Sequence, residues 1–307
     1  MPPMNPNGQF PADFLWSAST SAWQFEGGAL DEGKGPSVQD IRPGQREILR
    51  TASDHLHHLE EDVALLKALG LRLIAFDFVV PRAAAGARSS QRAGTGVLCP
   101  FDQPVEGNQI EPIVTLYHDD LPWALARQGG WACRETIDAF EDYCGLMFDH
   151  FAGQVLYWQP ICEQNLLTID RLLSPSGSLA QAFQENHHRT LAQARVFRRF
   201  HQRGYPGWIG PALNLVKVYP LTPDPEDVEA AMNMELIRNW LDLDLAVSGR
   251  YSAPAAALLT RLGAMPKLEP GDAETLKSGL ATMVSFSSYT SVTVKKARPQ
   301  ALRIRPG

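Results

Sequence analysis

The chain has 307 residues, of which 44% are hydrophobic and 20% charged, and its formal net charge is −6. This is the composition of an ordinary globular protein with a substantial core, and it offers no basic footprint for nucleic acid. No apolar run reaches the roughly 20 residues that a bilayer span needs, and residues 1–9 lack the order of a secretion signal. We therefore expect no nucleic-acid or membrane partner, and four cysteines without a CxxC pair indicate reduced thiols in a cytoplasmic protein.

Strand-like and helix-like segments alternate along the chain. Apolar runs predict strands, and apolar residues at helical spacing between capping residues predict helices. The predicted strands cover residues 14–16, 71–78, 111–118, 155–163, 208–216 and 282–289. The predicted helices cover residues 51–69, 134–151, 179–203, 225–247 and 272–279. Between residues 82 and 107 there is room for only a short helix.

One stretch combines a strand pattern with reactive side chains. Residues 155–165 read VLYWQPICEQN, an apolar run that ends in a thiol, a carboxylate and two amides. A buried strand has this pattern when its carboxyl end opens into a polar site. In parallel barrels the catalytic groups lie at that end of the strands, so Glu163 is the first candidate catalytic residue. The apolar residues before it would shield its carboxyl group from water and favour a role in proton transfer.

The alternation of strands and helices predicts an α/β fold with a mainly parallel sheet. The lack of a GxGxxG motif after the first strand favours a barrel over a dinucleotide-binding fold. With six recognisable strands we predict a TIM-type (β/α)8-barrel derivative, shortened at its C-terminal end. It forms a single domain over residues 1–307, with a tail of uncertain structure over residues 291–307. Six strands cannot close such a barrel, so we expect the tail runs VTVKK and LRIR to supply strands; a homodimer across the open side is the alternative.

Several segments resemble one known family and occur in its order. They read FPADFLWSASTSAWQFEGG at residues 10–28, EPIVTLYHDDLPWALARQGGW at 111–131, ENHHRTLAQARVF at 185–197 and NWLDLDLAVSGRYS at 239–252. The chain resembles the family-one glycoside hydrolases, the β-glucosidase and 6-phospho-β-glycosidase group. The resemblance implies a (β/α)8 barrel and retaining cleavage of β-glycosidic bonds.

The resemblance also implies roles for individual residues. Glu163 aligns with the family's acid/base, His118 with the His of the loop after the third strand, and Tyr289 with the second Tyr of an NYYT segment. We take these three as the expected catalytic residues. Gln24 matches the family Gln that binds sugar hydroxyls, and Trp123 is a further expected substrate-binding residue.

Other positions depart from the family pattern. Cys162 stands where the family has the Asn that holds the sugar 2-hydroxyl, Asp119 where the loop has Trp, and Asp77 where a strand has Ser. We expect these three residues to bind a substrate in a differently charged pocket. Ala75 replaces the Arg beside the family nucleophile, and no later segment of the chain resembles the nucleophile motif.

Three hypotheses follow. The preferred one is an enzyme of specialised metabolism that uses Glu163 for non-hydrolytic acid/base chemistry (elimination, isomerisation or ring closure) on a small, sugar-like or polyhydroxylated molecule. The alternatives are a non-catalytic pseudo-glycosidase that binds a ligand or partner, and a residual β-glycosidase. A Cys162–His118 nucleophile pair and a metal site built from the acidic residues and His118 are disfavoured. We expect neither a cofactor nor a metal.

Overall fold

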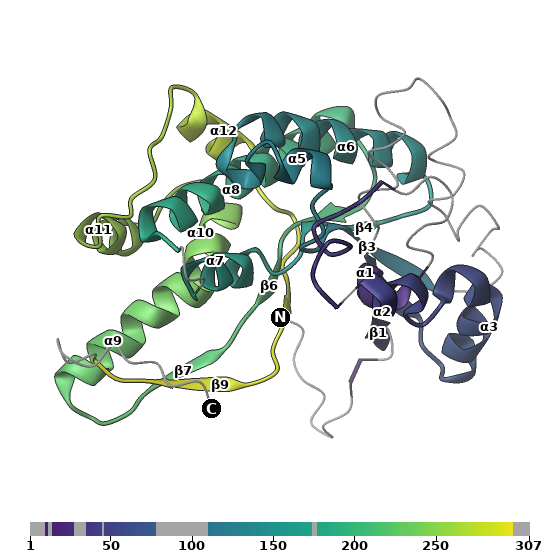
Figure 1. The fold of residues 1–307 in the computed structure, drawn as a ribbon, viewed down its shortest axis with the longest axis horizontal. Helices are drawn as coiled ribbons and strands as arrows, with labels where there is room; N and C mark the ends of the chain where they lie inside the picture. Colours follow the sequence, from purple (N-terminus) through teal and green to yellow (C-terminus); the bar gives the residue numbers. More distant parts are fainter. Residues whose placement is uncertain are drawn as a thin grey trace. The chain divides into compact units, whose positions relative to one another are not determined.

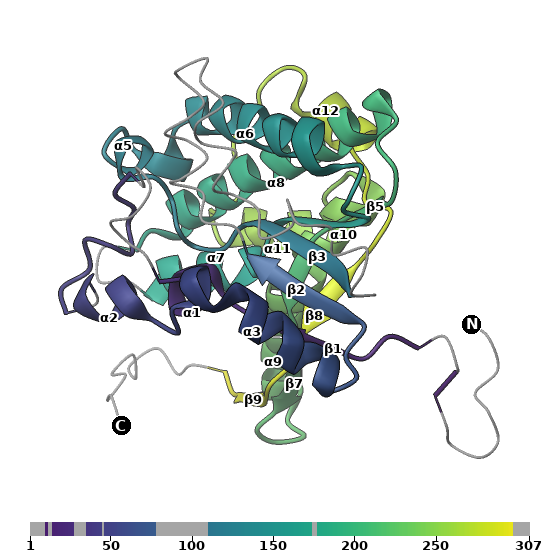
Figure 2. The ribbon, with the colours of Figure 1, turned by 90° about the vertical axis from the view of Figure 1, so that its right-hand side faces the viewer.

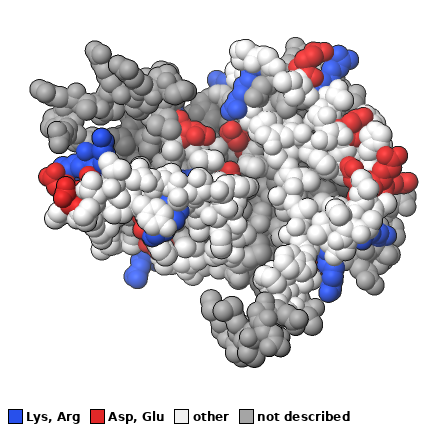
Figure 3. Space-filling view, turned by 90° about the horizontal axis from the view of Figure 1, so that it is seen from below, with Lys and Arg blue, Asp and Glu red and all other residues white. Residues whose placement is uncertain are grey.

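The computed structural model describes residues 10–11, 14–27, 35–44, 46–77, 110–173 and 177–296. They divide into two compact units, one formed by Met1–Ala126 with Asp149–Trp158 and the other by Arg127–Phe148 with Gln159–Gly307. Over the described ranges, no helix has both the length and the apolar character needed to cross a membrane. On the face that Figure 3 shows, acidic and basic side chains are interspersed.

The first unit is built on a parallel sheet that one helix covers (Figure 2). Strand β2 (Leu73–Asp77) lies between β1 (Ser17–Ser19) and β3 (Glu111–Tyr117), and all three run in the same direction. Ile74 of β2 is 2% exposed and contacts Ile110, and the side chains of Val63 and Leu66 from α3 (His55–Ala68) pack against both. Shorter helices are α1 (Ala22–Phe25), α2 (Arg46–Thr51) and α5 (Trp123–Ala126).

The second unit is mainly helical and is centred on α8 (Leu179–Arg203), which contacts α7, α10 and α12 (Figure 1). The aromatic side chains of Phe183, Phe197 and Phe200 on α8 are each 1% exposed, so this helix supplies much of the core. The other helices are η3 (Gly130–Ala132), α6 (Glu135–Phe151), α7 (Gln164–Leu173), α9 (Pro225–Glu235), η4 (Leu236–Trp240), α10 (Leu241–Ser248), α11 (Ala253–Arg261) and α12 (Asp272–Ser278).

Short strands complete the second unit. They are the end of β4 (Tyr157–Ile161), β5 (Trp208–Ile209), β6 (Ala212–Asn214), β7 (Lys217–Pro220), β8 (Ser285–Ser287) and β9 (Ser291–Val294). Strand β6 pairs in parallel with β8, and β7 pairs in parallel with β9. Ala231 of α9 packs on Val218 of β7, with Val292 and Val294 of β9 beside them, so α9 is held by an apolar face of that strand pair.

Most predicted elements are confirmed, and the helix at residues 179–203 has the predicted ends. The predicted strand over 208–216 is wrong as a single element, because it is divided into β5 and β6. A Cβ at Gly210 would overlap the backbone oxygen of Met283, and Pro211 has no N–H for a strand ladder. The prediction for 225–247 missed a π-helix in its middle. The strand predicted at residues 14–16 is wrong in position, because β1 begins at Ser17. The prediction also missed strand β7 and helices α1, α2, α5, α7 and α11.

The tail behaves partly as predicted. Its VTV run forms β9, which pairs with β7 in a separate two-stranded sheet. Alternating β-branched residues favour a strand, but the apolar face of β7 and α9 decides which partner it takes. The LRIR run and the short helix expected between residues 82 and 107 lie outside the described residues.

Candidate functional site

Glu163 lies at the junction between the end of β4 and the first residue of α7. Its backbone has φ 53°, a left-handed conformation that is uncommon for a residue with a side chain and costs about 1–3 kcal/mol. The neighbouring strand holds it there: the Glu163 N–H donates to the Ala212 oxygen at 2.7 Å, and Cys162 forms a bridge with Ala212. The sharp turn places a half-buried carboxylate at the carboxyl end of a strand, as the sequence predicts.

Two donors from neighbouring strands bind the same oxygen of this carboxylate. Asn214 Nδ2 and Ser287 Oγ each donate to Glu163 Oε1 at 2.7 Å. Asn214 ends β6 and Ser287 ends β8, and the two residues are partners in the parallel register. Because both strands end at the same level, their last side chains converge on Glu163.

Arg238 fixes the orientation of the Asn214 amide. Its Nη2 donates to Asn214 Oδ1 at 2.6 Å and its Nη1 to the Asn214 backbone oxygen at 2.7 Å. The amide oxygen therefore faces the guanidinium and the amide nitrogen faces Glu163. Burial lowers the pKa of Arg238, an effect that the negative charge of Glu163 opposes. The guanidinium thus acts on Glu163 through Asn214 and through its charge.

A buried amide network holds the start of α7. Asn165 Nδ2 donates to the backbone oxygens of Asn214 and Arg238 at 2.8 and 2.7 Å. Gln164 Nε2 donates to Asn186 Oδ1 at 3.0 Å, and Asn186 Nδ2 donates to a carboxylate oxygen of Asp242 at 2.7 Å. These bonds tie the residues that follow Glu163 to β6 and α8, so the Glu163 turn has little freedom to move.

Other expected residues of the second unit are placed differently. Cys162 precedes Glu163 and is half-buried, as expected for a residue beside the carboxylate. Tyr289 follows β8 and is 79% exposed, and the β8 side chain that reaches Glu163 is that of Ser287.

The remaining expected residues belong to the first unit. Gln24 is exposed on α1, and His118 and Trp123 are half-buried after β3. Asp119 has φ 54° and accepts hydrogen bonds from Gln39 and Arg42 at 3.2 and 3.3 Å. Asp77 ends β2, and its side chain lies outside the described part of the structure. Their roles stay predictions.

Sequence analysis missed the three side chains that organise the Glu163 carboxylate. Asn214 had a weak signal, as a polar residue within the apolar run at residues 212–216. Ser287 was not singled out, although it lies two residues before Tyr289. Arg238 gave no signal, because an Arg in a predicted helix is usually on the surface. In the structure it is 7% exposed.

Comparison with known proteins assigns the family. The model of glycosyl hydrolase family 1 matches residues 6–305, and the chain belongs to this family. It is 34% identical to aryl-phospho-beta-D-glucosidase BglC of Bacillus subtilis, over 94% of this chain and 63% of that protein. It is 29% identical to beta-glucosidase A of Acetivibrio thermocellus, over 93% of this chain and 66% of that protein.

A solved structure of a beta-glucosidase has a similar fold. The psychrophilic beta-glucosidase BglU from Micrococcus antarcticus matches with a TM-score of 0.85 and 29% identity, over 97% of this chain and 66% of that one. The fold class is therefore the predicted α/β derivative of a TIM-type barrel. The chain spans 63% and 66% of the two curated relatives' lengths. The names of these relatives fit the β-glycosidase hypothesis better than the non-hydrolytic chemistry preferred from the sequence.

Proposed function

We propose that this chain acts on β-glucosides, with Glu163 as the group that transfers a proton to and from the glycosidic oxygen. The observation that carries the proposal is the Glu163 carboxylate, held at the end of β4 by Asn214 and Ser287. Membership of glycosyl hydrolase family 1 and the names of the relatives support the substrate class. The roles proposed from the resemblance for Gln24 and His118 belong to the same proposal.

The hydrogen bonds orient the carboxyl group for proton transfer. Oε1 accepts from both Asn214 and Ser287, and these two bonds hold the plane of the carboxyl group in one orientation. In the first step a nucleophile bonds to the anomeric carbon, the bond from this carbon to the glycosidic oxygen breaks, and the protonated carboxyl group gives its proton to that oxygen. In the second step water displaces the nucleophile from the anomeric carbon, and the carboxylate removes a proton from this water. Arg238 is a positioning residue, since it acts on Glu163 through Asn214.

Retaining hydrolysis also requires a nucleophilic carboxylate about 5 Å from the acid/base. We assign the role of this nucleophile to no described residue. The experiment therefore adds azide as an external nucleophile. Azide attacks the anomeric carbon of p-nitrophenyl β-D-glucoside, the bond to the phenol oxygen breaks, and this oxygen takes the proton of Glu163. The products are glucosyl azide and nitrophenol, and Glu163 regains its proton from water.

The experiment measures nitrophenol release from p-nitrophenyl β-D-glucoside and from its 6-phosphate, with and without azide. We expect Glu163→Gln to lower the rate by about 10²–10⁴-fold, the usual contribution of general acid catalysis. With 2,4-dinitrophenyl β-D-glucoside, whose leaving group needs no proton, the loss is expected to be much smaller. Comparing p-nitrophenyl β-D-glucoside with its 6-phosphate also shows whether the substrate must carry a 6-phosphate.

Matched variants separate the acid/base role from general damage. Glu135→Gln removes an exposed carboxylate at the start of α6 and is expected to leave the rate unchanged. Asn214→Ala is expected to lower it, and Cys162→Ala tests the alternative thiol nucleophile. Full turnover by Glu163→Gln, or no release by the wild-type chain from any of these substrates, contradicts the proposal. Saturable binding without turnover would then favour the non-catalytic hypothesis.

A further inference from the structure

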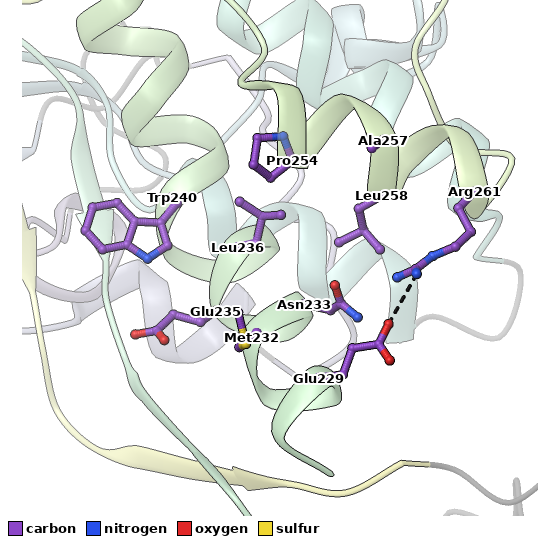
Figure 4. A pocket seen from close by; sticks show the side chains of 10 residues that line it. All are labelled: Glu229, Met232, Asn233, Glu235, Leu236, Trp240, Pro254, Ala257, Leu258 and Arg261. Carbon is purple, nitrogen blue, oxygen red and sulfur yellow. Dashed lines mark hydrogen bonds and ion pairs between the residues drawn. The ribbon is translucent and has the colours of Figure 1, made fainter. Parts of the chain in front are cut away.

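A pocket lies in the second unit, between the α9–η4 segment and α11 (Figure 4). Its volume is about 510 Å³, within the range of about 300–1,000 Å³ that is usual for ligand pockets. Its lining comes from residues 229–240 and 254–261. It shares no residue with the Glu163 site described above.

The pocket has an apolar body with an aromatic side chain at one end. Leu236 and Leu258 line its middle, and Leu258 is 6% exposed. Trp240 is 49% exposed and Met232 is 65% exposed. Figure 4 shows the indole of Trp240 at the end of the pocket away from Arg261. A flat, half-exposed aromatic ring offers a surface on which another ring can stack.

The opposite end carries polar groups. Arg261 Nη1 lies 3.2 Å from Glu229 Oε1, and the amide of Asn233 lies between this ion pair and the apolar body (Figure 4). Both carboxylates of the lining are paired, Glu229 with Arg261 and Glu235 with Lys217 at 3.3 Å. Because Arg261 is already neutralised by Glu229, the site disfavours an anionic ligand. Together the amide, carboxylate and guanidinium offer donors and acceptors for neutral hydroxyl groups.

An irregular helix gives the pocket its shape. The Leu241 N–H donates to the Leu236 oxygen, five residues back, which is the bond pattern of a π-helix. Such insertions destabilise a helix and are frequent at functional sites. Here the wide turn directs Arg238 into the buried bonds with Asn214, while Leu236 and Trp240 line the pocket.

We propose that this pocket binds an uncharged hexopyranoside, with the apolar face of the sugar ring stacked on Trp240 and its hydroxyl groups bound by Asn233, Glu229 and Arg261. The site is distinct from the one around Glu163 and does not depend on turnover there. A phosphorylated sugar is disfavoured, because the guanidinium of Arg261 in the lining is already paired with Glu229.

The test follows the indole N–H signal of Trp240 by NMR, assigned by its loss in Trp240→Phe. Phenyl 1-thio-β-D-glucoside, which resists hydrolysis, is titrated into the chain, and glucose 6-phosphate serves as the anionic probe. We expect a saturable shift of this signal with the thioglucoside, a shift that persists in Glu163→Gln, and no shift with glucose 6-phosphate. Calorimetry is expected to show that Trp240→Ala weakens this binding at least tenfold and that Trp240→Phe largely keeps it.

Trp208→Ala is the matched control, because Trp208 is 46% exposed in the same unit and does not line the pocket. Its effect on binding is expected to be negligible. The proposal is overturned if the Trp240 signal is insensitive to saturating thioglucoside, if glucose 6-phosphate shifts it equally, or if Trp240→Ala binds as the wild type does. If the Trp240 signal shifts with protein concentration in the absence of ligand, the pocket is an interface between copies of the chain, and this result would also overturn the proposal.

Discussion

Asp272 at the start of α12 is a buried carboxylate whose partners are all in the second unit. Its side chain is 4% exposed, and it accepts hydrogen bonds from Arg134 at 2.6 and 3.2 Å and from the Glu269 N–H at 2.8 Å. His187 Nε2 lies 3.1 Å from Asp272 Oδ2, the oxygen that also accepts from Glu269. Burial by itself raises the pKa of Asp272, but the bonds from Arg134, Glu269 and His187 outweigh it and lower the pKa to about 2.

This shift makes the stability of the fold depend on pH. The ordinary pKa of an Asp is 3.8, and a tenfold change in proton affinity is about 1.4 kcal/mol, so the charged form gains about 2 kcal/mol on folding. Because the folded pKa is the lower one, this stabilisation is present above pH 3.8 and is lost as the pH falls towards 2. Asp272→Asn is therefore expected to cost about 2 kcal/mol at pH 7 and much less near pH 2.

Urea unfolding of the wild type and of Asp272→Asn at a series of pH values between 2 and 7 measures this difference. The two curves of unfolding free energy against pH are expected to converge below pH 3.8. Asp138→Asn is a control, because Asp138 is 65% exposed and its ion pair with Arg195 lies at the surface. A constant difference between Asp272→Asn and the wild type over the whole range would refute the reasoning.

Two further substitutions test other contacts of the second unit. Burial raises the pKa of Asp242, although the hydrogen bond from Asn186 opposes this effect. Because the folded pKa is the higher one, the contribution of Asp242 to the free energy of unfolding falls as the pH rises from 3.8 through the folded pKa. Asp242→Asn keeps an acceptor for Asn186 and is expected to be as stable as the wild type at pH 7 or more so; equal destabilisation at pH 4 and pH 8 by urea unfolding would contradict this. Gly279→Ala places a Cβ against the backbone oxygen of Ala194 and is expected to cost at least about 1–3 kcal/mol by thermal unfolding, whereas Gly153→Ala, where the space is open, is the neutral control.

Local patterns were sufficient for the longer elements. Helix α8 carries apolar residues at helical spacing over 25 residues, and it begins and ends at the predicted residues. Strand β4 was predicted because an apolar run ended in polar side chains, and Glu163 was selected for the same reason. Both features depend on residues that are neighbours in the chain, and such signals survive without tertiary context.

The surroundings of Glu163 depend on contacts that no local pattern contains. Its carboxylate binds Asn214, 51 residues later, and Ser287, 124 residues later. Arg238 was assigned to a helix without a role, although it holds the Asn214 amide. The pairing of β6 with β8 brings these groups to one level, and only the folded chain determines that register.

The sequence alone determined the order of the main helices and strands and the candidate carboxylate, because these depend on local periodicity and on side chains adjacent along the chain. The barrel lineage was implied by the resemblance to the family-one glycoside hydrolases. Tertiary structure decided which groups hold the Glu163 carboxylate and where the helix over 225–247 widens into a π-helix. It also decided that Trp240 lines a pocket with the Glu229–Arg261 pair at its other end. Hydrogen bonds and packing between distant segments outweigh local preference at these positions, and their partners exist only once the chain has folded.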